Sequence, residues 1–177
     1  LIEDFNTFDD AKRIEFYPKI ASHCTAIENG QIVFTRLYCL LDSEALRASS
    51  VLHNSGSKIN KCSQLDNINY SFQIPMDEPI YLVNLITGSR YNKKACGYAI
   101  TSTGIYVKSE KKEKPTLIKW NDYTSANIYL DSYSKKTMEK MLIINELYFP
   151  IKFSRYNLDF LLELKRYVCF IRDNLKS

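Results

Sequence analysis

After Pro75 the chain carries a succession of short apolar segments, and this pattern constrains the fold more than any other feature. The segments are rich in β-branched and aromatic residues, and glycine, asparagine or serine separates them. Parallel strands need long crossover connections, usually helical, and no helical pattern stands between these segments. The sequence therefore predicts a run of antiparallel strands in the second half of the chain.

Five stretches carry this strand signal. They are "EPIYLVNLIT" (78–87), "CGYAITSTGIYVKS" (96–109), "PTLIKW" (115–120), "SANIYLD" (125–131) and "KMLIINELYFPIKF" (140–153). The second stretch predicts two strands around Ser102-Thr103-Gly104, or one strand bent there. The last predicts a hairpin that turns at Asn145-Glu146, because asparagine tolerates a positive φ.

One amphipathic helix is predicted after the strands. Asn157 is a candidate N-cap, and Arg172 and Lys176 lie where the negative end of a helix dipole favours cations. The apolar positions recur at helical spacing. They are Phe160, Leu161, Leu164, Tyr167, Val168, Ile171 and Leu175.

Before Pro75 the first helix is predicted to begin at a capping box, Thr7–Asp10, and to be limited by Pro18. Asn29-Gly30 indicates a turn. Phe8, Ala11, Ile14 and Glu15 follow helical spacing.

From Val33 to Leu52 apolar residues recur at steps of three and four, which predicts a long helix with one buried face. Two alternatives stay open. The opening "QIVFTRLY" (31–38) is rich in strand-forming residues, and Asp42-Ser43 is a candidate cap that would split the helix. The polar stretch 53–63 predicts a loop.

Together these patterns predict an α+β fold with two parts. A helical N-terminal segment (1–74) precedes a strongly bent antiparallel sheet, or partly open barrel, that a C-terminal helix caps (75–177). The 13 tyrosines suggest that part of the buried surface carries hydroxyl groups in need of hydrogen-bond partners.

Composition favours a chain of the cytoplasm. The five cysteines are widely spaced and odd in number, which is atypical of a disulfide-stapled secreted scaffold. No signal peptide and no apolar run of membrane-spanning length is visible, and the single sequon, Asn69–Ser71, does not outweigh this. The formal net charge of +4 is too small to indicate a dedicated nucleic-acid binder. The abundance of Lys, Asn, Ile and Tyr suggests an AT-rich bacterium.

The second half resembles a bacterial pleckstrin-homology-like (PH-like) domain over about residues 76–177. "GYAITSTGIYVK" is similar to the "T-x-x-G-I-Y" strand pair of that family, and the aromatic residue of "LIKW" is similarly placed on the next strand. The resemblance implies a bent antiparallel sheet of about seven strands that the last helix plugs at one end. It implies binding of lipid headgroups, peptides or proteins more than catalysis, without a cofactor.

Two basic loops are the candidate binding positions. The first, with Arg90, Tyr91, Lys93 and Lys94, has no intervening acid, but the strand that follows lacks the basic residues of phosphoinositide-binding relatives. The second includes Lys108, Lys111, Lys112 and Lys114. Because Glu110 and Glu113 interrupt it, a solvated hairpin end is the simpler interpretation of the second loop.

Catalysis has little support in the sequence. A cysteine nucleophile needs a nearby base, and the two histidines are His23 and His53. His23 adjoins Cys24, but neighbours on a helix point apart by about 100°. A pairing of His53 with Cys24 or Cys62 has no sequence support. No zinc-ligand spacing, Walker A motif or G-x-G-x-x-G motif occurs, so no metal site or nucleotide site is expected.

The sequence therefore favours a non-catalytic interaction module, of adaptor or immunity type, that binds another protein. Peripheral binding to an anionic membrane through the basic loops is the alternative. A small Cys/His enzyme or a nucleic-acid binder ranks third, because tyrosines on a sheet pack against neighbours more often than they stack on bases.

Overall fold

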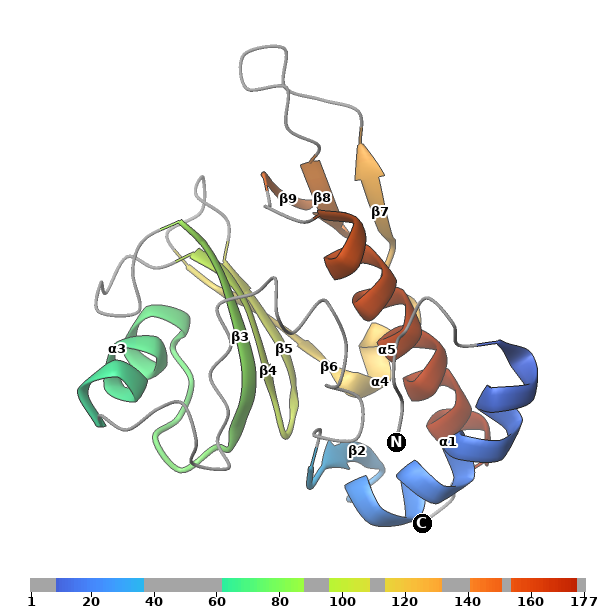
Figure 1. Cartoon of the computed structure of the whole chain (residues 1–177). Helices are drawn as coiled ribbons and strands as arrows, with labels where there is room; N and C mark the ends of the chain where they lie inside the picture. The colour runs from blue at the N-terminus through green and yellow to red at the C-terminus, as the bar shows by residue number, and fades with distance from the viewer. Residues whose placement is uncertain are drawn as a thin grey trace.

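The computed structural model describes residues 9–36, 62–87, 96–108, 114–131, 141–150 and 154–174. Figure 1 shows helices and antiparallel sheets, with one helix near the start of the chain and one at its end. The described strands form sheets of two, four and three strands, and none of these sheets closes on itself. The fold class is therefore α+β, as the sequence predicts.

The four-stranded sheet has the order β3-β4-β5-β6. Its strands are β3 (Ile80–Thr87), β4 (Cys96–Thr101), β5 (Gly104–Lys108) and β6 (Thr116–Lys119). The chain turns at Ser102–Thr103, so the two-strand version of this prediction is confirmed. Gly104 lies so close to β6 that a Cβ there would stand 2.2 Å from the carbonyl oxygen of Ile118. Only glycine permits this approach.

The three-stranded sheet contains β7 (Ile128–Asp131), β8 (Met141–Ile144) and β9 (Leu147–Pro150) in that order. The predicted hairpin at Asn145-Glu146 is confirmed, and Asn145 has a φ of 56°. Its backbone amide donates to the carbonyl of Asn127 (2.7 Å), and its Oδ1 accepts from the Asn127 amide (2.9 Å). A short helix, α4 (Trp120–Tyr123), which the sequence did not reveal, lies between β6 and β7.

The C-terminal helix α5 (Ser154–Asn174) begins before Asn157, so the predicted cap at Asn157 is wrong. The predicted apolar face is correct for the described residues, and Leu175 lies outside them. Its buried members are Phe160, Leu161, Leu164, Tyr167, Val168 and Ile171. With this face α5 contacts α4, β7 and β8.

Near the N-terminus, α1 (Asp10–Cys24) begins after Asp9, whose carboxylate accepts a hydrogen bond from the Lys12 amide. The prediction that Pro18 limits this helix is wrong, because Pro18 lies inside it. The predicted helical spacing is correct for Ala11, Ile14 and Glu15, which lie in α1, although the side chain of Ile14 is 78% exposed. The buried positions instead follow the contact with the rest of the fold. They are Tyr17, Ile20, Ala21 and Cys24.

A hairpin follows α1 directly, formed by β1 (Thr25–Glu28) and β2 (Gln31–Phe34) around the predicted turn at Asn29-Gly30. The strand alternative for the start of "QIVFTRLY" is therefore the one observed. Residues 37–61 lie outside the described part, as does the candidate cap Asp42-Ser43. The helix α3 (Cys62–Phe72) begins inside the stretch that was predicted as a loop.

The described core has two clusters, one on each side of the four-stranded sheet. The smaller joins α3 to that sheet through residues such as Phe72 and Val83. The larger unites α1, the β1-β2 hairpin, the two larger sheets and α5. At its centre Phe34 stacks on Trp120, with ring centroids 4.3 Å apart, and also touches Tyr167. Residues from both sides of Pro75 share this core, and a domain boundary near Pro75 stays a prediction.

Candidate functional site

The helices α1 and α5 contact one another, and they cross at a wide angle (Figure 1). Arg13, near the start of α1, contacts Glu163, and Tyr17, one turn later, contacts Tyr167 and Phe170. The ring of Tyr17 lies 5.4 Å from that of Tyr167 and 5.5 Å from that of Phe170. Residues far apart in sequence are thus brought into one seam between the two helices.

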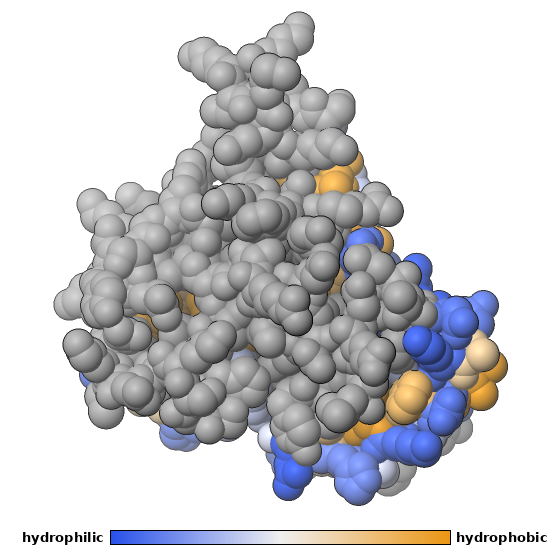
Figure 2. All heavy atoms as spheres, viewed as in Figure 1, coloured by the Kyte–Doolittle hydropathy of each residue, from blue (hydrophilic) through white to orange (hydrophobic). Residues whose placement is uncertain are grey.

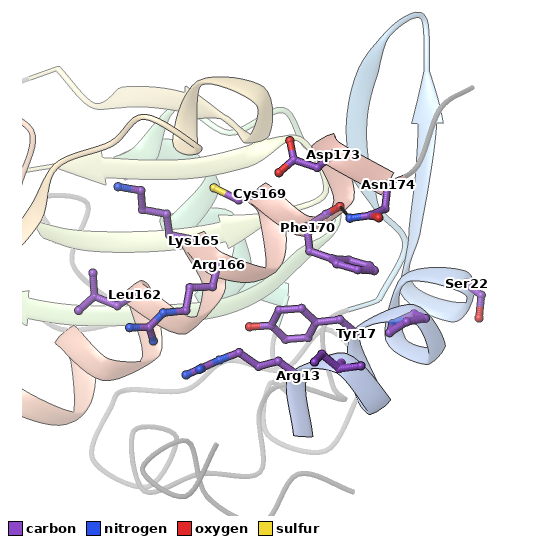
Figure 3. Close-up of a pocket in the computed structure, with 12 residues that line it drawn as sticks. Arg13, Tyr17, Ser22, Leu162, Lys165, Arg166, Cys169, Phe170, Asp173 and Asn174 are labelled. Carbon is purple, nitrogen blue, oxygen red and sulfur yellow. Dashed lines mark hydrogen bonds between the residues drawn. The ribbon is translucent and has the colours of Figure 1, made fainter. Parts of the chain in front are cut away.

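A groove of about 950 Å³ follows this seam (Figure 3). From α1 it is lined by Arg13, Ile14, Tyr17, Pro18 and Ser22. From α5 it is lined by Leu162, Lys165, Arg166, Cys169, Phe170, Asp173 and Asn174. Its volume lies within the range of pockets that hold ligands or short peptide segments.

The α1 wall of the groove carries two exposed apolar residues, Ile14 and Pro18. Ile14 projects with 78% of its surface exposed, and the neighbouring Pro18 adds a second apolar group. Pro18 has no amide hydrogen, so it cannot donate to the Ile14 carbonyl as a regular helix requires. Figure 2 shows hydrophobic side chains interleaved with hydrophilic ones over the surface at α1. Single exposed apolar side chains are common on protein surfaces, so Ile14 and Pro18 matter here because both line the groove.

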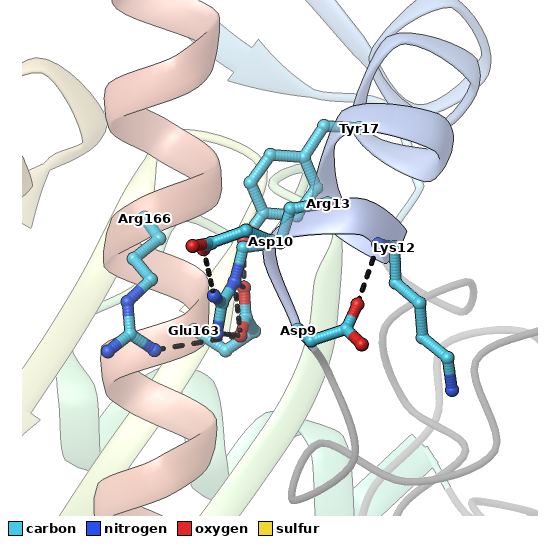
Figure 4. A network of polar contacts seen from close by, with 7 residues as sticks. All are labelled: Asp9, Asp10, Lys12, Arg13, Tyr17, Glu163 and Arg166. Carbon is cyan, nitrogen blue, oxygen red and sulfur yellow. Dashed lines mark hydrogen bonds and ion pairs between the residues drawn. The ribbon is translucent and has the colours of Figure 1, made fainter.

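Three lining residues of the groove contact a buried carboxylate, Glu163, which is only 2% exposed. Arg13 donates to it from Nε, 3.1 Å from each carboxylate oxygen, and from Nη2 at 2.8 Å (Figure 4). The hydroxyl of Tyr17 donates to Oε2 of the same carboxylate. Arg166 is further away, with Nη1 3.6 Å from Oε1. Glu163 thus satisfies its acceptors mainly with groups from α1.

Arg13 is held from two sides. Besides Glu163, it donates from Nη1 to Asp10 at 2.9 Å. The side-chain hydrogen bonds to Glu163 raise the pKa of the Arg13 guanidinium, with burial acting in the opposite direction and Asp10 contributing a smaller increase. Arg13 and Glu163 therefore form a charge-neutral pair that fixes α1 on α5.

Two cations of the groove have weaker compensation. Lys165 donates to the Ala126 carbonyl at 2.7 Å, which is a neutral partner. Arg166 is 54% exposed, and its ion pair within the described residues is the 3.6 Å contact to a carboxylate that Arg13 already holds. At the other end of the groove, Asp173 pairs with Arg172 at 3.0 Å. Because Asp10 and Glu163 balance Arg13 and Arg166, the end of the groove near Lys165 and Arg166 carries one excess positive charge.

The groove lacks the chemistry of a metal or nucleophilic site in the part that is described. No three His, Cys, Asp or Glu side chains converge there as metal ligands. Cys169 lines the groove, and its thiol faces the Thr124 carbonyl at 3.7 Å. His23 is exposed and does not line the groove, and Cys24 is buried. His53 lies outside the described residues.

The residues predicted to bind a partner lie mostly outside the described part. Arg90, Tyr91, Lys93 and Lys94 fall there, as do Lys111 and Lys112. Lys114 is described and exposed. The structure therefore leaves the two basic loops as predictions. Lys108, by contrast, is partly buried and donates to the backbone carbonyl and hydroxyl oxygens of Ser71.

Sequence reasoning missed the groove, although a signal for it exists. The helix α5 carries a second stripe of residues at helical spacing, beside the stripe that faces the core. Its members are Leu162, Lys165, Arg166, Cys169, Phe170 and Asp173. Because α5 has apolar residues on the stripe that faces the core and also on this second stripe, it has two packing faces. The second face indicates contact with another helix or strand. The sequence does not reveal that this element includes α1.

Comparisons with protein-family models, with curated proteins and with solved structures found no significant match. The described helices include none with the length and apolar character of a bilayer span. The function of this chain is therefore inferred from its own sequence and geometry.

Proposed function

We propose that this chain is a non-catalytic interaction module and that the groove between α1 and α5 binds a short segment of a partner protein. The observation that carries this proposal is the exposed apolar wall of Ile14 and Pro18, opposite Leu162 and Phe170, in a groove of about 950 Å³. Covering apolar surface is the main source of free energy in most protein association.

The arrangement of the strands supports the resemblance to PH-like domains as part of this proposal. Sheets of four and three antiparallel strands precede the helix α5, which agrees with the seven strands and terminal helix that the resemblance implies. Such scaffolds bind more often than they catalyse, but a fold alone names no ligand.

The groove also supports binding without catalysis. The adjacent buried carboxylate, Glu163, is occupied by Arg13 and Tyr17, and the thiol that lines the groove, Cys169, has no histidine beside it among the lining residues. A nucleophile without an adjacent base is poorly activated. We place the module in the bacterial cytoplasm, in keeping with its cysteine usage.

Selection of displayed peptides tests the proposal. Random 16-residue peptides would be selected on the intact chain and then measured on two matched variants, Ile14→Ser and Met76→Ser. Both positions carry exposed apolar side chains, but only Ile14 lines the groove. We expect Ile14→Ser to weaken selected peptides about tenfold and Met76→Ser to leave them unchanged, since a buried apolar side chain contributes about 1.5–3 kcal/mol.

Two results would count against this function. Selected peptides that bind Ile14→Ser as tightly as the original chain would show that the groove is not the binding site. Salt-sensitive binding to phosphatidylserine vesicles that is lost when Arg90, Lys93 and Lys94 are neutralised, with no peptide selected, would favour the anionic-membrane alternative instead.

A further inference from the structure

The charges of the groove specify more than a generic apolar contact. The pair Arg13–Glu163 is neutral, and Asp173 is compensated by Arg172. Asp10 also binds Arg13, so Arg13 and Arg166 face two carboxylates among the described residues. Lys165, whose partner is the Ala126 carbonyl, carries the excess positive charge. A segment that covers the groove would bring these cations near its own side chains. Opposite charge there lowers the free energy of the complex, and like charge raises it.

The shape of the groove favours a helix as its occupant. The α5 residues that line it recur at steps of three and four from Leu162 to Asp173, which corresponds to about 17 Å along the helix axis. On the α1 side Ile14 and Pro18 are one turn apart. An amphipathic helix can pack side chains at positions i, i+3, i+4 and i+7 against such a row of residues on α5.

We infer that the partner segment is an acidic amphipathic helix of about three turns, whose apolar face packs on Ile14 and Phe170 and whose carboxylates pair with Arg166 and Lys165. This inference rests on the proposed function, since it names the occupant of the same groove. Arg166 is the main specificity-determining residue. Its guanidinium is about half exposed at the basic end of the groove, and the nearest carboxylate is already held by Arg13 (Figures 3 and 4).

A second copy of this chain is a poorer occupant. If two copies met groove to groove about a twofold axis along the groove, each copy would present the same basic end to the other. About an axis across the groove, the basic end would instead face Asp173, whose charge Arg172 already compensates. Placing Lys165 and Arg166 against their counterparts would concentrate like charge at the interface and oppose association. The acidic end of a different helix has no such cost.

Two labelled peptides test the inference directly. Both would be 14-residue amphipathic helices with the same leucine face, one with glutamate and the other with lysine at the flanking polar positions. Fluorescence anisotropy at 50 and 300 mM NaCl would measure their affinities for the intact chain. We expect the acidic peptide to bind at least about tenfold more tightly than the basic peptide at low salt, and the difference to shrink at high salt.

Matched variants assign the effect to Arg166. Arg166→Gln is expected to weaken binding of the acidic peptide about fivefold to tenfold. Lys119→Gln, which removes an exposed cation of β6 that does not line the groove, is expected to change it less than about twofold. Arg166→Glu should in turn improve binding of the basic peptide. Circular dichroism and urea unfolding of each variant confirm that it is folded.

The outcomes separate the inference from the function on which it rests. Suppose that both peptides bind equally, that Ile14→Ser abolishes their binding and that Arg166→Gln does not change it. The groove then binds amphipathic helices, but the inference of an acidic partner is wrong. If neither peptide binds, the inference is overturned, and only the display selection then decides the proposed function. A dimer in sedimentation velocity that Ile14→Ser dissociates would overturn the inference in favour of a second copy.

Discussion

Glu163 shows how a single residue links the two ends of the described chain. It lies on α5 with almost no exposed surface, yet its hydrogen-bond donors Arg13 and Tyr17 come from α1, about 150 positions earlier. A buried carboxylate is tolerated only when its acceptors are satisfied by donors, preferably cationic ones. The position of α1 on α5, and with it the groove, therefore depends on this carboxylate.

The substitution Glu163→Gln tests that dependence. It leaves Arg13, which is mostly buried, without its main countercharge, and we expect it to lower the free energy of unfolding by about 2–3 kcal/mol. Asp10→Asn is the matched control, because Asp10 also binds Arg13 but is 95% exposed. The control should cost only about 0.5 kcal/mol. Urea unfolding at pH 7 measures both, and equal losses would contradict a structural role for the buried carboxylate.

Gly104 is required because the backbone of β6 lies very close to it. A Cβ at this position would stand 2.2 Å from the backbone oxygen of Ile118, and backbone atoms in paired strands cannot move aside cheaply. We expect Gly104→Ala to destabilise the chain by about 3 kcal/mol or more.

Gly30 provides the comparison for Gly104. It has a φ of 74°, but no atom lies within 4 Å of the position that a Cβ would take, so Gly30→Ala meets only backbone strain of about 1 kcal/mol. Thermal unfolding of Gly104→Ala and Gly30→Ala compares the two losses of stability. A larger loss in Gly30→Ala would show that φ, and not the approach of β5 to β6, is the stronger constraint.

At the scale of elements, the strands were more predictable than the helices. Turn residues separate the strands, and a residue such as Asn145 specifies its turn through local chemistry alone. Pro18 misled the prediction of α1, because packing on α5 stabilises a helix that the proline weakens locally. The helix α3 was missed because its polar start resembles a loop, while its buried residues, such as Phe72, find their partners in the sheet.

The turn between β8 and β9 provides a test at this scale. Asn145→Ala removes the hydrogen bond to the Asn127 amide and places alanine at a positive φ, and we expect a loss of about 1–2 kcal/mol. Asn145→Gly relieves the φ but still lacks the hydrogen bond, so its loss should be smaller, about 0.5–1 kcal/mol. Urea unfolding compares the two. If glycine costs as much as alanine, the side-chain hydrogen bond alone accounts for asparagine at this turn.

For the whole molecule, the fold class was predictable but the groove was not. Periodicity identifies the face of α5 that meets the core, since such residues repeat every three or four positions. It does not identify which distant helix lies along the other face. That pairing depends on contacts such as Tyr17 with Phe170, which only the folded chain brings together. Binding residues were predicted from the sequence in the basic loops, and the groove that α1 and α5 form together was therefore not predicted.

The abundance of tyrosine also acts at this scale, through the response of the fold to alkaline pH. Burial raises the pKa of Tyr81 and of Tyr106 to about 12, from an ordinary value of 10.0. Both residues come from the four-stranded sheet, and Tyr81 also donates to the Phe34 carbonyl at 2.7 Å, which ties that sheet to β2. The folded state therefore retains protons that the unfolded chain releases.

The raised pKa values of Tyr81 and Tyr106 predict that the fold loses stability at alkaline pH. Below about pH 10 both states keep the tyrosine protons and stability is unaffected, whereas between about pH 10 and pH 12 only the unfolded state loses them and stability falls. In Tyr106→Phe one of these protons is absent, so the urea midpoint should fall less steeply over that window. Tyr81→Phe should also reduce the slope, but from a lower starting midpoint, because it loses its hydrogen bond to Phe34 at every pH. Urea midpoints at pH 8, 10 and 11 distinguish the effects of the two substitutions. If the midpoint falls as steeply with pH in Tyr106→Phe as in the original chain, the burial of Tyr106 does not contribute to alkaline unfolding.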